Sequence, residues 1–451
     1  MIKHIFHTFR GAACSGALVA LMLAGLAAPA AATKIERITS PGGIEFWLVR
    51  DSTVPLVAVN FAIRGGSSQD PADKGGLAEM TVATLDEGAG DLDTTAFQDR
   101  LERKAIELQL RATRDYVRGT LRTLTENQDE AFDLLGLALT KPRFDTPAVE
   151  RVRAQMISRL QRQSTSPNDI VSRSFWATAF PNHPYGRSSN GTLDSVPKIT
   201  ADDMRGYVRR VLARDTLKIG IVGDIDAATA GRLLDRTFGG LPAKADLTPV
   251  PDVEMQGLGS RVVTDLDVPQ AAVMFGGRGV ARSDPDFMAA YIVNHILGGG
   301  SFSSRLYHEV RDKRGLAYGV STSLVWFLHA PVMVGSTATR SDATAQSVEV
   351  IEDEVRRLAT EGPTAEELEK TKTYLKGSFA LGLDTSSKIA SQLVQMQTDN
   401  LGIDYFERRS ALIDAVTLED TRRMAKRLLD GGLLVTVAGR PKGLKPRAPG
   451  G

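Results

Sequence analysis

Two separate stretches of this sequence occur twice. VPLVAVNFAIRGG (residues 54–66) resembles VPQAAVMFGGRGV (residues 268–280), and the two copies lie 214 positions apart. TPAVERVRAQMISRL (residues 146–160) resembles TAEELEKTKTYLKGS (residues 364–378) at nearly the same offset. Two matches at one offset indicate an internal duplication. The sequence therefore predicts two domains of one fold in place of a single large core.

The order of the expected elements predicts the fold class of each domain. IEFWLVRD and VPLVAVNFAI alternate like neighbouring strands, and IELQLRAT with YVRGTLRTL forms a hairpin joined at Arg114–Asp115. A buried strand, LKIGIVGD, follows the helices. The expected helices cover residues 74–87, 94–104, 126–140, 147–163, 168–179 and 201–213. This order predicts an α+β fold with two homologous domains, each an antiparallel-rich sheet packed with helices.

The N-terminus has the pattern of an export signal. Lys3 and Arg10 precede an apolar run from about residue 17 to residue 28, which is too short to span a bilayer. The run ends in APAAATK, which favours cleavage after Ala32, with an uncleaved anchor as the alternative. The only cysteine, Cys14, lies inside this segment, so the mature chain forms no disulfide. We expect a periplasmic protein.

The domain boundaries follow from composition. We expect a signal peptide at 1–32, a first domain at 33–240 and a second domain at 261–441. Residues 241–260 are rich in proline and glycine and lack periodicity, which is typical of a linker. The last residues, 442–451, have the composition of a disordered tail.

Charge and histidine content exclude several functions. Without Lys3 and Arg10 the chain has 53 basic residues of the original 55 against 54 acidic ones, so no basic excess favours nucleic acid or an anionic membrane. Four histidines remain after residue 32, and no two have the i, i+4 spacing of a zinc helix. The sequence therefore predicts no metal site of its own, and it offers no other metal-binding constellation.

Several long stretches nevertheless carry a family resemblance. They are RGGSSQDPADKGGLAEM, TENQDEAFDLLGLALTKPRFDTPAVERVR, HPYGRSSNGTLDSV, LKIGIVGDI and ILGGGSFSSRLYHEVRDKRGLAYGVST. Together these stretches resemble the insulinase/pitrilysin family of zinc metallopeptidases, in its short two-domain branch. The resemblance implies half of a clamshell, which must pair with a second half to close a chamber.

The resemblance also places the family's zinc site on residues that have lost its chemistry. In the family, H-x-x-E-H puts two histidines on one helix face to bind zinc, and its glutamate activates water. Alignment on the glycine-leucine-alanine run places Glu79 and Ala83 at the histidine positions and Val82 at the general-base position. Arg159 occupies the position of the third ligand, where a guanidinium would repel a cation. Glu79 and Arg159 are either plain helix residues or partners across the vacated pocket.

A different part of the family's site is kept. An arginine and a tyrosine seven residues apart hold the substrate and stabilise the oxyanion in the family, and Arg311 and Tyr318 match them. The alternative is that Arg311 pairs with Glu309 or Asp312 and Tyr318 caps a strand.

The resemblance implies a non-catalytic subunit of a periplasmic, heterodimeric, peptide-degrading zinc metallopeptidase. A homologous chain with H-x-x-E-H would carry the zinc, and this chain would carry no cofactor but would add Arg311 and Tyr318 to the partner's site. Its partners would be that chain and peptide substrates, with no nucleic acid and, after signal cleavage, no membrane. The alternative function is a catalytically inert scaffold or peptide-binding protein of the same fold.

Overall fold

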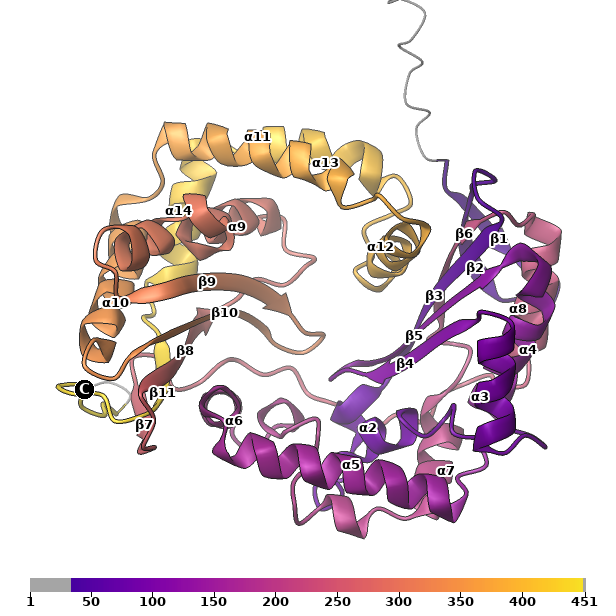
Figure 1. Cartoon of the computed structure of the whole chain (residues 1–451). Helices are drawn as coiled ribbons and strands as arrows, with labels where there is room; N and C mark the ends of the chain where they lie inside the picture. Colours follow the sequence, from indigo (N-terminus) through magenta and orange to yellow (C-terminus); the bar gives the residue numbers. More distant parts are fainter. Residues whose placement is uncertain (1–33, 449–451) are drawn as a thin grey trace, which may run out of the picture.

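The chain forms two α+β halves, each built on one twisted sheet (Figure 1). The computed structural model describes residues 34–448, so the expected signal peptide lies outside the described residues. The α+β fold class with two domains is confirmed. Within residues 34–448, no helix combines the length and the apolar character that crossing a bilayer requires.

The first sheet has six strands in the order β1-β2-β6-β3-β5-β4. Its central pairs are antiparallel, and only β2 and β6 run parallel. The strands are β1 (Glu36–Thr39), β2 (Glu45–Arg50), β3 (Leu56–Arg64), β4 (Glu107–Ala112), β5 (Tyr116–Leu124) and β6 (Lys218–Gly223).

The second sheet repeats the topology of the first with the order β7-β11-β8-β10-β9. Its one parallel pair, β7 with β11, corresponds to β2 with β6, and the remaining pairs are antiparallel. The strands are β7 (Arg261–Thr264), β8 (Gln270–Arg278), β9 (Ala317–Trp326), β10 (Pro331–Arg340) and β11 (Leu434–Ala438). Strands β3 and β8 coincide with the first repeated sequence stretch, so the predicted duplication is confirmed.

The helices of the two halves follow the same order along the chain. Those of the first half are α2 (Leu77–Val82), α3 (Thr94–Arg103), α4 (Gln128–Thr140), α5 (Thr146–Thr165), α6 (Pro167–Ala179), α7 (Ala201–Val211) and α8 (Ala227–Phe238). Those of the second half are α9 (Phe287–Asn294), the π-helical turns η5 (His295–Gly299) and η7 (Tyr307–Asp312), α10 (Thr344–Glu361), α11 (Ala365–Leu381), α12 (Ser386–Thr398), α13 (Tyr405–Asp414) and α14 (Leu418–Leu429).

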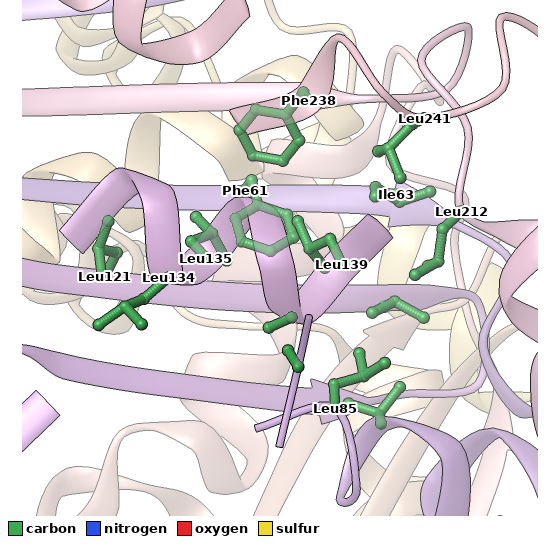
Figure 2. Packing of buried hydrophobic residues seen from close by; sticks show 14 of the residues in the cluster. Phe61, Ile63, Leu85, Leu121, Leu134, Leu135, Leu139, Leu212, Phe238 and Leu241 are labelled. Carbon is green, nitrogen blue, oxygen red and sulfur yellow. The ribbon is translucent and has the colours of Figure 1, made fainter. Parts of the chain in front are cut away.

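Each half has its own apolar core between one sheet face and its helices. In the first half, Phe61 on β3 meets Phe238 on α8 edge to face at a centroid distance of 5.3 Å. Figure 2 shows this pair beside Leu135 and Leu139 of α4. Alternate side chains of β3, Phe61 among them, point to one sheet face, and α4 with α8 covers that face.

The opposite face of each sheet is covered by a helix from the other half. Helix α12 packs on β3 and β6 of the first sheet, and α6 packs on β8 and β11 of the second. Gln397 on α12 donates to the backbone oxygen of Ile219 over 2.8 Å, and Thr436 on β11 donates to the backbone oxygen of Val171 on α6 over 3.0 Å. The two halves are therefore joined by a reciprocal exchange of helices. The prediction of two domains that follow one another in the sequence does not include this exchange.

The segment predicted as a linker, residues 241–260, is irregular and contacts both halves. Thr248 and Gln69 exchange two hydrogen bonds of 2.8 and 3.0 Å. Further along, the backbone N–H of Val253 donates to the oxygen of His329 in the second half over 2.9 Å. These contacts hold the linker against the body of the protein.

The prediction of a disordered tail at 442–451 is wrong for its first seven residues, 442–448. Leu444 is buried, and the Arg447 guanidinium binds Glu352 and the backbone oxygen of Gly259. Arg447 also pairs its backbone with that of Arg261 beside β7. Composition does not predict this, because one arginine that binds two half-buried partners is enough to anchor a polar segment.

Candidate functional site

The helix at the vacated metal position is shorter than predicted. The expected helix of residues 74–87 is present only as α2 (Leu77–Val82), and the residues after Ala83 form tight turns. It begins after Gly76, whose φ of 92° places it in the left-handed region that favours glycine. An added Cβ there would lie 3.0 Å from the backbone oxygen of Asn190. The start of α2 is therefore fixed by backbone geometry and close packing.

A buried aspartate binds the start of this helix. The Asp70 carboxylate accepts from the backbone N–H of Gly76 over 2.8 Å and from that of Ala78 over 2.9 Å. Free N–H groups and the helix dipole at an N-terminus favour an acceptor of this kind. Burial nevertheless raises the pKa of Asp70 to about 7, against the opposing effect of these donors and of the Arg187 charge.

This shift predicts a pH dependence of stability. Because the pKa of Asp70 is raised, the folded protein holds a proton that the unfolded chain releases, and the associated stability is lost as pH rises through about 7. We expect the free energy of unfolding of the wild type, relative to Asp70→Asn, to fall between about pH 4 and about pH 7. Urea unfolding of both proteins across this range measures the difference. Parallel curves would contradict the raised pKa.

The four vacated positions are filled by one ion pair and two apolar side chains. Arg159 Nη1 on α5 lies 3.1 Å from Glu79 Oε1 on α2. The two residues are therefore partners in an ion pair and not unpaired helix residues. Val82 is buried, and Ala83 has no ligand atom. Glu79, with its carboxylate already held by a guanidinium, is the one ligand-type side chain among them. These residues do not fit a tetrahedral zinc site, which needs three protein ligands and an open position for catalysis.

The rest of the described chain offers no substitute. Across residues 34–448, no group of three or more His, Cys, Asp or Glu side chains is placed to hold a metal ion.

Arg311 and Tyr318 lie next to each other in the second half. Arg311 is on η7, and Tyr318 is at the start of β9. The guanidinium carbon of Arg311 lies 4.8 Å from the centroid of the Tyr318 ring and 4.8 Å from that of Tyr307. Two rings therefore hold the cation by cation–π contact and leave its N–H groups available. Tyr318 is 87% exposed, so its hydroxyl can reach a molecule outside this chain.

The neighbouring acids are engaged elsewhere. Glu309 binds Lys313 over 2.7 Å and Arg314 over 2.6 Å. Burial alone would raise the pKa of Glu309, but these two cations outweigh it and lower the pKa to about 2. Asp312 faces His308 at 3.5 Å. The structure thus does not show the alternative pairing of Arg311 with Glu309 or Asp312.

The two pairs of site residues remain separate. Glu79 with Arg159 belongs to the first half, Arg311 with Tyr318 belongs to the second, and no hydrogen bond or ion pair found in the described structure joins them. Sequence reasoning missed Tyr307, although its i, i+4 spacing to Arg311 was a usable signal.

The fold and the site define a two-domain metallopeptidase scaffold whose own ligand positions are vacated. Residues 46–193 match the family described as insulinase (peptidase family M16), and residues 198–375 match the peptidase M16 inactive domain. The chain belongs to this insulinase family.

Individual relatives agree with this assignment. The non-peptidase homolog YmxG of Helicobacter pylori is 29% identical over 335 residues, which cover 74% of this chain and 77% of the relative. The uncharacterized zinc protease YmxG of Bacillus subtilis is 24% identical over 79% of this chain and 86% of its own. The crystal structure of a peptidase M16 inactive domain from Pseudomonas fluorescens superposes with a TM-score of 0.85 at 25% identity, over 92% of this chain and 99% of that one.

Proposed function

We propose that this chain is the non-catalytic subunit of a periplasmic, two-chain zinc peptidase that degrades peptides. A homologous chain with an intact H-x-x-E-H motif would supply the zinc and the general base. This chain would supply Arg311 and Tyr318 to the partner's site and would bind peptide together with it.

One observation carries the proposal: this chain has lost the metal-binding part of the family's site but has kept the arginine and the tyrosine. The ligand positions are closed by the Glu79–Arg159 ion pair. Arg311, which is half-buried, and Tyr318, which is exposed, lie in contact and have no carboxylate partner among the described residues. A guanidinium and a phenol are the donors that stabilise negative charge on a tetrahedral intermediate. Such a pair has a use only if another chain brings the reacting centre.

The proposal predicts what the purified chain does with and without its partner. Alone, it binds no stoichiometric zinc and cleaves no peptide, because the ligand positions do not fit the metal. A pull-down of the tagged mature chain from its native periplasm brings down a homologue of similar size. The eluate contains one zinc per pair and loses its peptidase activity on chelation. Stoichiometric zinc in the lone chain would overturn the proposal.

The alternative, an inert scaffold, gives a different result in the same experiment. The chain then elutes alone or in a larger assembly without zinc or activity. The Helicobacter pylori relative is named a non-peptidase homolog, and this name agrees with an inert role for that protein. For this chain, the contact of Arg311 with the Tyr318 ring favours the subunit of an active enzyme.

A further inference from the structure

A small cavity in the first half is lined by three arginines. It has a volume of about 150 Å³ and lies between the tip of the β4–β5 hairpin, the corner joining α5 to α6, and the loop at 186–190. Arg114, Arg173 and Arg187 line it, and Asp169 is the one acidic residue of its wall. Three cations against one anion give the cavity an excess of positive charge, and we call it the arginine pocket.

These arginines have no counter-charge in contact. Within residues 34–448, no carboxylate lies within 4.0 Å of the guanidinium nitrogens of Arg114, Arg173 or Arg187, although most other arginines of the chain form such pairs. Arg114 and Arg187 are half-buried and Arg173 is exposed. A guanidinium that is even partly removed from water without a partner carries a desolvation cost. A cavity that gathers three unpaired guanidinium groups is therefore prepared for an anion from outside.

Arg114 is the most constrained of the three. Its guanidinium carbon lies 4.4 Å from the ring centroid of Trp176 and 5.1 Å from that of Phe327, and its Nε is buried without an acceptor. The adjacent Asp115 does not serve it, because that carboxylate accepts from the Tyr185 hydroxyl and from the backbone N–H of Leu328. Burial accordingly lowers the pKa of Arg114, and a bound anion would offset this cost.

The arginine pocket adjoins the vacated metal position. Gln163, which lines the pocket, lies one helical turn after Arg159 on the same face of α5. On the other side, Asn190 of the pocket wall packs against Gly76 at the start of α2. A peptide segment lying along the Glu79–Arg159 pair therefore comes within reach of the three arginines.

We propose that the arginine pocket binds a carboxylate of a peptide, either its C-terminus or an aspartate or glutamate side chain. The inference rests on the proposed function and names the class of peptide that this subunit holds. A planar carboxylate matches the fork of a guanidinium, with two parallel hydrogen bonds. The excess of positive charge would attract a phosphate group as well. We favour the carboxylate because the peptides of the proposed function carry carboxylates, so competition with phosphate is part of the test.

Fluorescence anisotropy on the purified chain alone tests this proposal. Three labelled peptides of otherwise identical, acid-free sequence are compared: one with a free C-terminus, one amidated, and one amidated with an internal glutamate. We expect the free acid, the glutamate peptide or both to bind roughly 10-fold tighter than the amidated, acid-free peptide, as loss of a charge-assisted hydrogen bond predicts. Which of the two binds identifies the source of the carboxylate.

Variants localise the effect. Arg173→Gln and Arg187→Gln should remove the preference for a carboxylate, whereas Arg162→Gln, which removes the same charge outside the pocket on α5, should keep it. Arg114 is left unchanged because its contacts with Trp176 and Phe327 tie it to folding. The proposal is overturned by equal affinity for all three peptides, by no binding of any, by unchanged preference in both variants, or by displacement with inorganic phosphate at lower concentration than with acetate.

Failure here is distinguishable from failure of the proposed function. Peptide binding is measured without the partner, whereas the pull-down measures partner, zinc and activity. A complex that cleaves all three peptides alike would retain the subunit role and remove the arginine pocket from it.

Discussion

In the assembled complex, Tyr318→Phe and Arg311→Ala should each lower the peptidase kcat by roughly 10-fold or more, with about 100-fold as the usual loss when one donor of an oxyanion site is removed. The physical reason is that charge on the substrate oxygen develops only in the transition state, so the lost hydrogen bond appears in kcat more than in KM. Steady-state kinetics on complexes of equal subunit content measure this. Tyr318→Phe keeps the ring that faces Arg311 and removes the hydroxyl alone.

Matched controls separate chemistry from assembly. Tyr374→Phe removes a hydroxyl from another exposed tyrosine of the same half, on α11, and should leave kcat unchanged. Arg311→Lys keeps the charge and the partner contact but loses the guanidinium fork, so it should recover only part of the activity. If Tyr318→Phe and Arg311→Ala both kept full activity in an intact complex, the scaffold alternative would be favoured.

Local patterns predicted the fold well where they carried the signal. Strand alternation marked β3 within residues 54–66, and the repeat of this stretch at residues 268–280 marked β8, the equivalent central strand. The hairpin at Arg114–Asp115 also lies where its sequence places it. The helix exchange was not predictable, because α6 and α12 are amphipathic helices whose sequences do not say which sheet they cover.

The candidate site was predictable in its residues but not in its contacts. Positions 79, 82, 83 and 159 followed from a motif, and the pairing of Glu79 with Arg159 was one of two alternatives until the geometry of α2 and α5 was known. The arginine pocket was not predictable at all. Arg114 lies on a hairpin tip, far in the sequence from Arg173 on a helix and Arg187 on a loop, and only the fold brings the three together.

The helix exchange can be tested at a single glycine. Gly220 lies on β6 under α12, and a Cβ there would come within 2.6 Å of the backbone oxygen of Ala390 and 2.8 Å of Leu393 Cβ. Because the obstacle is helix backbone, α12 as a whole must move. We expect Gly220→Ala to lower the free energy of unfolding by about 1–3 kcal/mol, as overpacking of a well-packed contact does. Urea unfolding measures the loss.

Gly377→Ala on α11 is the matched control. A Cβ at Gly377 meets no atom within 4 Å, so the same change in a helix should raise the free energy of unfolding by about 0.5–1 kcal/mol. Opposite signs at the two glycines would show that α12 is tightly docked on the first sheet in solution. Equal, small changes in the free energy of unfolding at the two glycines would mean that α12 is only loosely packed on the first sheet. Since α12 follows α11 in the half that carries Arg311 and Tyr318, tight docking would also fix where that pair is presented to a partner.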